Sequence, residues 1–578
     1  MTHARQRKWA GRTIAGFLLA TTGVLLGLLA CSDRAVPPAR TTVTDYQMPV
    51  ADVAAVIGAR LGSDPDPAHG DVTPAEQAQL KTLYETGGNA PLWVDATGRP
   101  TRSARDALAL LSGAASDGLD PADYGCAQLG RLSARLEAAP PRLVDDVATF
   151  DVALSAGMLR FLRHLRAGRV DPQTTGFRLS VPADRHDSVV WLRAAIADER
   201  IADTAAELAP ALVQYRALRA MLARYRSLAA DTSLESLPPP AATVHEGEAY
   251  PALDALYRRL VAFGDLPPET PEPAEGAIYA EPLVDGVKRF QIRHGLEADG
   301  VLGQATQAAL NVSLTWRVHQ IELALERLRW LPDLRDDRFV ALNIPMFTLW
   351  AWDSIPPDGA PSFGMRAIVG RALRTQTPVF LEEMRSVIFR PYWNVPVSIL
   401  RHEILPILGR DLDYLHRQDM EIVRGPGDDA QPVAATTETI ALLRQGSLRL
   451  RQRPGPRNSL GLIKFVFPND ENVYLHGTPA QELFKRTRRD FSHGCVRLED
   501  PVALAEWVLK EQPEWTRDRI LAAMSGTQSV RVNLTRPMRV ILFYTTAVVM
   551  PEDGTIRFAE DIYTHDKQLD QALARRHS

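Results

Sequence analysis

The hydrophobic pattern of the chain changes near residue 337, and this change limits the possible folds more than any other feature of the sequence. Before it, apolar residues recur at helical spacing, for example over 144–165. After it, short alternating runs such as 338–344 are typical of strands. A chain of 578 residues with a helical part followed by a β-rich part is a multidomain α+β protein.

Changes of composition and pattern divide the chain into segments. Proline-rich stretches such as 237–240 mark linkers between them. The predicted segments are a signal peptide or lipobox at 1–31, a linker at 32–74, a helical scaffold domain at 75–245, a small helical module at 250–312, a connecting helix at 313–337, a β-rich domain at 338–535 with a helical insertion at about 396–455, and a C-terminal extension at 536–578.

Within the scaffold, the pattern predicts helices over 103–112, 144–165 and 205–226. A capping box, with Thr73 and Glu76 three residues apart, predicts the start of a further helix. We see no candidate catalytic residues in this scaffold.

The N-terminus has the features of an export signal. Four basic residues up to Arg12 precede an apolar run from Ile14 to Ala30, which is the pattern of a secretory signal. The run ends at Cys31, as in a bacterial lipobox whose cysteine carries lipid. An uncleaved signal anchor is the alternative, because about seventeen apolar residues can just span a membrane. Both interpretations predict a periplasmic protein tethered to a membrane.

Cysteine and charge usage narrow the possible chemistry. The chain has three cysteines, Cys31, Cys126 and Cys495, too few for a disulfide scaffold; Cys126 and Cys495 remain free to pair with each other. The net charge of −4 provides no general basic field for nucleic acid. We expect a monomer that needs no cofactor.

The most reactive combination of residues lies around Cys495. A His-Gly pair at 476–477 precedes it by nineteen residues, and His493 stands two residues before it. A thiol attacks as its thiolate, and a neighbouring imidazole lowers the thiol pKa, so either histidine is a candidate base. Gly494 leaves the backbone open for amide donors to an oxyanion, and Arg497 is a fixed cation suited to a carboxylate.

Two other interpretations of these residues are open. The cysteine can be an ordinary core residue flanked by packing histidines, or His476, His493 and Cys495 can bind zinc. The polar neighbours argue against a core position, and the spacing matches no zinc signature. We therefore predict a nucleophile and no metal.

The motifs His476-Gly477-Thr478 and Ser492-His493-Gly494-Cys495-Val496-Arg497 resemble the signature of L,D-transpeptidases with a YkuD-type catalytic domain. The stretches 329–332, 391–396 and 544–563 resemble the large periplasmic type, so that the resemblance covers about 75–578. It implies that a cysteine takes an acyl group from a donor stem tetrapeptide of peptidoglycan and releases D-alanine. The thioester then passes to the side-chain amine of a second stem, forming a 3→3 cross-link between diaminopimelate residues.

The resemblance also implies roles for single residues. Cys495 is the nucleophile and His476 the proton donor and acceptor. The other implied site residues are Gly477, whose carbonyl orients His476; His493 and Gly494, which line the oxyanion pocket with Cys495; Arg497, which places a substrate carboxylate or the loop; and Ser492, Tyr474 and Trp393 as further substrate-binding candidates.

The small module at 250–312 carries a second resemblance. Its runs 284–291, 295–306 and 310–311 are similar to the three-helix peptidoglycan-binding module of wall enzymes. This implies glycan and stem peptides as partners, with a generic helical hairpin as the alternative.

Two other functions fit the same residues. Water instead of an amine can resolve the thioester, which gives a thiol-dependent L,D-carboxypeptidase or endopeptidase. Alternatively, the chain is a non-catalytic lipoprotein that binds the wall. We expect the insertion at 396–455 to govern the acceptor groove and so to decide between amine and water.

Overall fold

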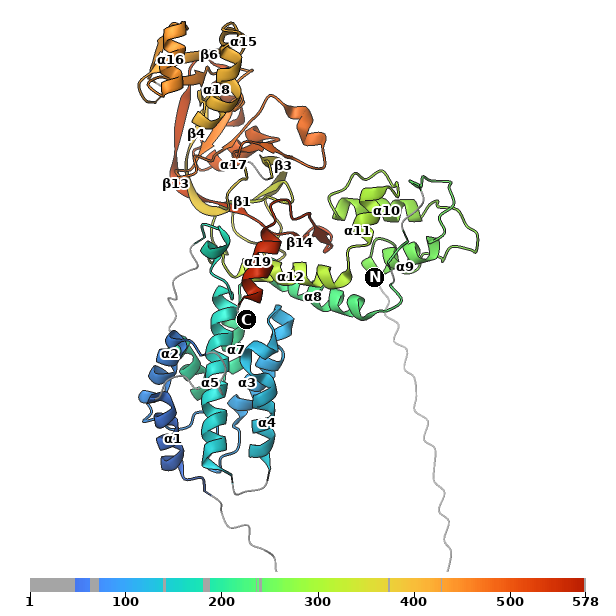
Figure 1. The fold of residues 1–578 in the computed structure, drawn as a ribbon, viewed down its shortest axis with the longest axis vertical. Coiled ribbons are helices and arrows are strands. Elements are labelled where there is room, and N and C mark those ends of the chain that lie inside the picture. The colour runs from blue at the N-terminus through green and yellow to red at the C-terminus, as the bar shows by residue number, and fades with distance from the viewer. Residues whose placement is uncertain are drawn as a thin grey trace, which may run out of the picture. The chain divides into compact units, whose positions relative to one another are not determined.

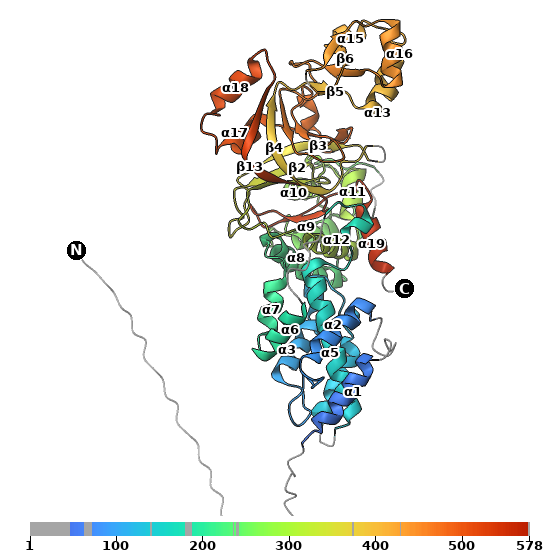
Figure 2. The same cartoon turned by 90° about the vertical axis from the view of Figure 1, so that its left-hand side faces the viewer.

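The computed structural model describes residues 47–62, 72–138, 142–179, 188–234, 236–238, 242–372, 375–427 and 429–575 (Figures 1 and 2). The predicted signal segment and Cys31 lie outside the described residues. Within the described ranges, no helix is long and apolar enough to cross a membrane.

The scaffold helices pack around one long helix, α5 (Val144–Ala167), which is buried along much of its length (Figure 1). Apolar residues at helical spacing produce this arrangement, because each surrounding helix turns one apolar face towards α5. The surrounding helices are α1 (Val50–Gly62), α2 (Pro74–Glu85), α3 (Arg102–Ser112), α4 (Cys126–Glu137), α6 (Ser188–Ala197) and α7 (Ile201–Leu208).

Two sequence predictions for this region need correction. The predicted linker 32–74 contains α1, whose Val53, Ile57 and Leu61 are buried; this short helix stands between polar, proline-rich stretches that obscured it. The predicted helix 205–226 is two helices, since Pro210 has no N–H to continue the first. The capping box at the start of α2 is confirmed: the Thr73 hydroxyl accepts from the Glu76 N–H.

Two helices, α8 (Val213–Ala230) and α12 (Leu314–Leu328), pack side by side (Figures 1 and 2). The predicted connecting helix is therefore confirmed as α12. Its end carries buried ions: Glu326 pairs with Arg329 at 3.1 Å, and Arg327 pairs with Asp566 of the C-terminal helix at 2.5 Å. All four side chains are fully buried.

The small module consists of α9 (Leu253–Phe263), α10 (Leu283–Arg293) and α11 (Gln304–Leu310), with an apolar core of its own. Gln291 fixes the turn between the last two helices, because its amide accepts from the Gly300 N–H at 2.8 Å and donates to Asp299 at 2.7 Å. Gly300 has a positive φ of 73°, which glycine adopts without strain. The predicted three-helix module is confirmed.

The β-rich domain is a nine-stranded sheet in the order β11-β3-β12-β10-β9-β4-β13-β1-β2. β2 also pairs with β3, so the strands from β3 to β2 close into a ring. The strands are β1 (Phe339–Asn343), β2 (Thr348–Trp352), β3 (Phe363–Gly370), β4 (Phe380–Phe389), β9 (Ile463–Val466), β10 (Leu475–His476), β11 (Asp490–Ser492), β12 (Val496–Leu498) and β13 (Val530–Phe543).

Two boundaries differ from the predicted ones. The strand-like runs at 379–380 and 386–390 belong to one strand, β4. The predicted boundary at 535 cuts through β13, whose residues 539–543 pair in parallel with β1. Pro537 lies at an irregularity in the β13–β4 pairing, where it needs no ladder donor; this proline hid the continuity of the strand.

Other elements follow the central strands. The sheet domain also contains α17 (Pro501–Leu509), with the predicted Asp500 N-cap confirmed by a 2.9 Å bond from the Ala503 N–H, and α18 (Arg517–Ser525). The C-terminal part adds β14 (Ala547–Val549), β15 (Ile556–Phe558) and α19 (His565–Ala574).

The insertion is a mixed subdomain, not a helical one. Helices form within 397–408 and at 437–445, as a helical insertion requires. A four-stranded sheet in the order β5-β8-β6-β7 is also present; it was not predicted, because its strands have only two to five residues. The insertion has a separate apolar core. Its elements are β5 (Trp393–Asn394), α13 (Val397–Ile399), a π-helical turn (Leu400–Ile404), α14 (Leu405–Leu408), α15 (Tyr414–Arg417), β6 (Met420–Arg424), β7 (Gln431–Val433), α16 (Thr437–Gln445) and β8 (Arg449–Gln452).

The buried ion pair between α12 and α19 gives the first prediction. Asp566→Ala leaves the Arg327 guanidinium buried without its carboxylate, so the free energy of unfolding should fall by about 3–5 kcal/mol, measured by urea denaturation. Asp413→Ala is the control: it breaks an exposed pair with Arg417 at 2.8 Å and should cost less than about 1 kcal/mol. Equal losses in the two variants would contradict the prediction.

Candidate active site

The register of β10 decides which side chains face the site. β10 lies between β9 and β12, with Leu475 opposite both Phe465 and Val496. These three side chains are buried in the apolar core. His476, the next residue along the strand, therefore points to the opposite face.

That opposite face gathers the polar residues predicted from the motifs. His476 pairs in register with Arg497 on β12 and with Lys464 on β9. Tyr474 and Cys495 each precede one of these residues by two positions, so alternation places them on the same face. The contacts agree, since the Lys464 Nζ lies 3.7 Å from the centroid of the Tyr474 ring, and the Tyr474 and His476 rings are 5.6 Å apart.

The His476 imidazole is buried and neutral. Its Nδ1 lies 2.5 Å from the Gly477 carbonyl oxygen. Only a protonated Nδ1 can donate there, so Nε2 keeps the lone pair of a base. Burial first, and then the positive charge of Arg497, lower the pKa of His476 to about 3. The predicted orienting role of Gly477 is consistent with this geometry.

The Cys495 thiol is also neutral in the free protein. Burial raises its pKa, while a backbone hydrogen bond from Tyr474, the Tyr474 hydroxyl and the charges of Lys464 and Arg497 oppose this rise. The Sγ donates to the Asn472 carbonyl at 3.8 Å. Within the described part of the chain, no hydrogen bond joins this thiol to His476. Proton transfer between them therefore belongs to a step after substrate has bound.

The loop before Cys495 is fixed by its own hydrogen bonds. The buried Ser492 hydroxyl donates to the Cys495 carbonyl at 2.5 Å and accepts from the Gly494 N–H at 3.1 Å. Gly494 has a φ of +111°, which favours glycine. Its carbonyl accepts from the Thr377 hydroxyl at 2.8 Å.

The predicted contribution of Gly494 to an oxyanion pocket stays a prediction; in this structure its N–H donates to the Ser492 hydroxyl. By contrast, the N–H groups of His493 and Cys495 have no hydrogen-bond partner among the described residues. These two amides are the donors available to a developing oxyanion.

A C-terminal tyrosine braces the loop that holds Gly494. The Tyr563 hydroxyl donates to the Gly370 carbonyl at 2.5 Å and accepts from the Thr377 N–H at 3.2 Å. The Thr377 hydroxyl in turn accepts from the Gly370 N–H at 2.8 Å. The predicted C-terminal extension is thus connected to the site through Thr377.

The insertion reaches the site at two points. His493 Nε2 lies 2.6 Å from a carboxylate oxygen of Glu403, in the π-helical turn of the insertion. Trp393 of β5 interacts with the side chain of Tyr474. The predicted residues His493 and Trp393 are therefore the ones that connect the insertion to the strands carrying His476 and Cys495.

Arg497, whose charge acts on the Cys495 thiol, lies near a second arginine, Arg371. Burial, and then the charge of Arg371, lower the pKa of Arg497, so the two guanidinium groups lie near each other. Neither forms an ion pair with a described residue. Two repelling cations of this kind favour a ligand that brings a carboxylate.

The structure also bears on two alternatives from the sequence, a disulfide between Cys126 and Cys495 and a zinc site. Cys126 and Cys495 are both free thiols. Among the described residues, no group of three His, Cys, Asp or Glu side chains is arranged to hold a metal ion.

The local sequence beside the site predicts more helix than forms. Thr478 with Gln481 three residues later has the spacing of a capping box, but only a 3-10 helix forms, Gln481–Lys485. The Thr478 hydroxyl accepts from the Ala480 N–H, and the Gln481 side chain donates to the Thr478 carbonyl. These bonds close a turn and do not cap an α-helix.

Sequence reasoning missed several residues of the site. The alternation of the predicted strand at 462–467 was enough to place Lys464 on the outer face. No sequence signal connects Arg371, Thr377, Glu403 or Tyr563 with Cys495, because each comes from a distant segment.

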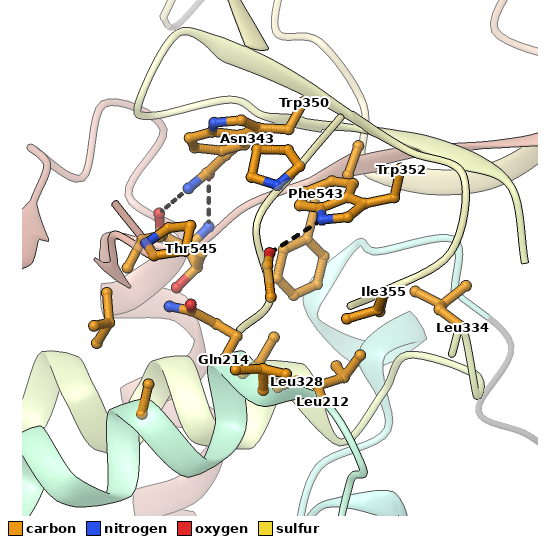
Figure 3. Close-up of a pocket in the computed structure, with 18 of the residues that line it drawn as sticks. Leu212, Gln214, Leu328, Leu334, Asn343, Trp350, Trp352, Ile355, Phe543 and Thr545 are labelled. Carbon is orange, nitrogen blue, oxygen red and sulfur yellow. Dashed lines mark hydrogen bonds between the residues drawn. The ribbon is translucent and has the colours of Figure 1, made fainter. Parts of the chain in front are cut away.

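A cavity of about 330 Å³ lies apart from this site, between α8, α12 and the strands β1, β2 and β13 (Figure 3). Its walls are mostly apolar, and its polar groups pair with each other: the Asn343 amide bonds to the backbone of Thr545, and the Trp352 indole to the Gly359 carbonyl. Neither Cys495 nor His476 lines it. The cavity therefore has no part in the chemistry of the thiol.

Comparison with protein families gives matches for three regions of the chain. Residues 337–532 match the L,D-transpeptidase catalytic domain, residues 78–222 a scaffold domain, and residues 250–310 a "Putative peptidoglycan binding domain". The matches cover the regions whose motifs resemble an L,D-transpeptidase and a peptidoglycan-binding module, and they confirm both resemblances for these regions.

A similar protein supports the match to the L,D-transpeptidase catalytic domain. The chain is 32% identical over 253 residues to a protein of Haemophilus influenzae described as "Putative L,D-transpeptidase". The aligned part covers 44% of this chain and 49% of the relative. The chain therefore spans about half the length of the relative that it matches.

Arg497 should lower the pKa of the Cys495 thiol. Its charge favours the thiolate, so Arg497→Gln should raise the pKa of Cys495 and move the pH profile of its alkylation by iodoacetamide to more alkaline pH. Alkylation is read at the Cys495 peptide by mass spectrometry. Arg536→Gln, which removes an exposed cation paired with Glu511, serves as control, and an unchanged profile in the Arg497 variant would count against this role.

Ser492 should hold the loop. Ser492→Ala leaves the Gly494 N–H and the Cys495 carbonyl without their partner, so the free energy of unfolding should fall by about 1–3 kcal/mol, as measured in urea. The exposed Ser525, whose hydroxyl bonds only to its own helix, should tolerate the same change without measurable loss. A stable Ser492→Ala protein would refute the bracing.

Proposed function

We propose that the protein is a cysteine L,D-transpeptidase that forms 3→3 cross-links in peptidoglycan and releases D-alanine from a donor tetrapeptide stem. One observation carries the proposal: the strand register puts Cys495, His476 and Arg497 on one face of a matched L,D-transpeptidase catalytic domain. A nucleophile, a base with a fixed tautomer and a cation on one surface are the parts that acyl transfer needs.

The first half-reaction follows from these groups. The thiol of Cys495 passes its proton to Nε2 of His476 as sulfur attacks the donor carbonyl carbon. The amides of His493 and Cys495 stabilise the oxyanion. His476 then protonates the leaving D-alanine amine, and the C–N bond breaks to leave a thioester. The low pKa of His476 suits this role, because its imidazolium is a strong acid and gives the proton up readily.

The charges around the thiol support a stem peptide as the substrate. Stem peptides carry free carboxylates, and Arg497 and Arg371 are cations without a described acidic partner. The peptidoglycan-binding module at 250–310 supplies a second attachment to the same polymer, which raises the local concentration of stems. We further propose that the protein works in the periplasm, tethered through Cys31 or an uncleaved anchor.

Purified protein incubated with disaccharide-tetrapeptide and analysed by mass spectrometry tests the proposal. A dimer that lacks one D-alanine is the expected product. Tripeptide without dimer would indicate hydrolysis instead of transfer. Unchanged tetrapeptide would contradict both transpeptidation and hydrolysis.

The nucleophile has its own test. Cys495→Ala should abolish product formation, a loss of at least about 10³-fold. A carbapenem should add one adduct mass to the wild-type protein and none to this variant. Cys126→Ala is the matched control, since it removes the other described free thiol and should leave both reactions intact; an adduct on Cys126 would reject the assignment.

A further inference from the structure

The two histidines of the site are held in opposite tautomers. His476 donates from Nδ1 to the Gly477 carbonyl, which leaves its Nε2 as the basic atom. His493 presents Nε2 to the Glu403 carboxylate at 2.6 Å. Because a carboxylate accepts but cannot donate, Nε2 of His493 carries the proton, and Nδ1 is its basic atom. Each ring therefore offers one lone pair.

The two histidines also differ in their access to water. His476 is 4% exposed, whereas the His493 side chain is 29% exposed and that of Glu403 is 51% exposed. A proton accepted by His493 can pass to solvent at once. A proton accepted by His476 stays buried, close to the charges of Lys464 and Arg497.

The second half-reaction needs such an exit for a proton. An alkylamine acceptor arrives as an ammonium, loses one proton to become a nucleophile, and loses another as it forms the amide. Lys464 and Arg497 lie beside His476 in the sheet and repel an ammonium on that side. Glu403 provides a negative charge on the insertion side, next to a solvent-accessible imidazole.

We propose that His493, held by Glu403, is the base for the acceptor amine, while His476 serves the donor step. This inference rests on the proposed function. The amine nitrogen attacks the thioester carbonyl carbon, and its proton moves to Nδ1 of His493 and on to solvent. The carbon–sulfur bond breaks, and the released thiolate takes a proton from solvent to restore the neutral thiol.

In this scheme Glu403 is a positioning residue. Its carboxylate fixes the tautomer and the orientation of His493. The insertion then takes part in the chemistry through one side chain, and it acts on the acceptor and not on the donor.

Separate measurement of the two half-reactions tests the inference. Acylation is followed by intact-protein mass spectrometry as the donor tetrapeptide adds to Cys495 with loss of D-alanine. Aminolysis is followed as dimer formation after disaccharide-tripeptide is added as the acceptor to the isolated acyl-enzyme. At saturating acceptor, Glu403→Ala should slow aminolysis about 10–100-fold and His493→Ala about 10²–10⁴-fold, in each case a larger loss than the same variant shows in acylation.

Conservative and matched variants separate chemistry from folding. Glu403→Gln keeps an acceptor for the Nε2 proton of His493, so it should retain more aminolysis than Glu403→Ala. Added imidazole should restore part of the aminolysis of His493→Ala, which no loss of structure would allow. Glu438→Ala removes another exposed carboxylate of the insertion, one with no described partner, and should change neither step.

The possible outcomes distinguish a failure of the His493 proposal from a failure of the proposed transpeptidase function. If the wild-type protein forms no acyl-enzyme, the proposed function fails. If acylation proceeds but the Glu403 and His493 variants keep full aminolysis, or lose acylation and aminolysis equally, the proposed function stands and His493 is not the acceptor base.

Discussion

The site depends on the register of one two-residue strand. β10 contributes only Leu475 and His476 to the sheet, and the burial of Leu475 against the core decides that His476 faces outward. A slip by one residue would exchange the two faces and bury the imidazole in the core. The flanking strands hold this register from both sides, β9 antiparallel and β12 parallel. The packing of Leu475 in the apolar core therefore specifies which side chains of β10 face the site.

Much of the fold could be predicted because periodicity is a local signal. The long helices, the three-helix module and the switch to strands near 337 all follow from patterns within short windows. The errors occurred where tertiary contacts decide. α1 is too short and too isolated in sequence to stand out, and the sheet of the insertion is built from strands of two to five residues. β13 continues past Pro537 only because its partners β1 and β4 are in place.

The sequence could indicate candidate reactive residues of the site, but not the residues that support them. Cys495 and His476 stand in compact sequence motifs, so they could be identified as candidates without a structure. The motif did not reveal that the Ser492 hydroxyl accepts from the Gly494 N–H. Glu403 belongs to an insertion some ninety residues upstream of His493, and only the folded chain brings a carboxylate to that ring.

The hydroxyl of Tyr563 connects the end of the chain to the loop around Cys495 through Gly370 and Thr377. Tyr563 follows Cys495 in the chain, so the cysteine is synthesised before the residue that braces its loop. A chain cut between these two positions would keep the thiol and lose the brace. The order of the two residues along the chain therefore makes the support of the Cys495 loop depend on the segment that follows the sheet.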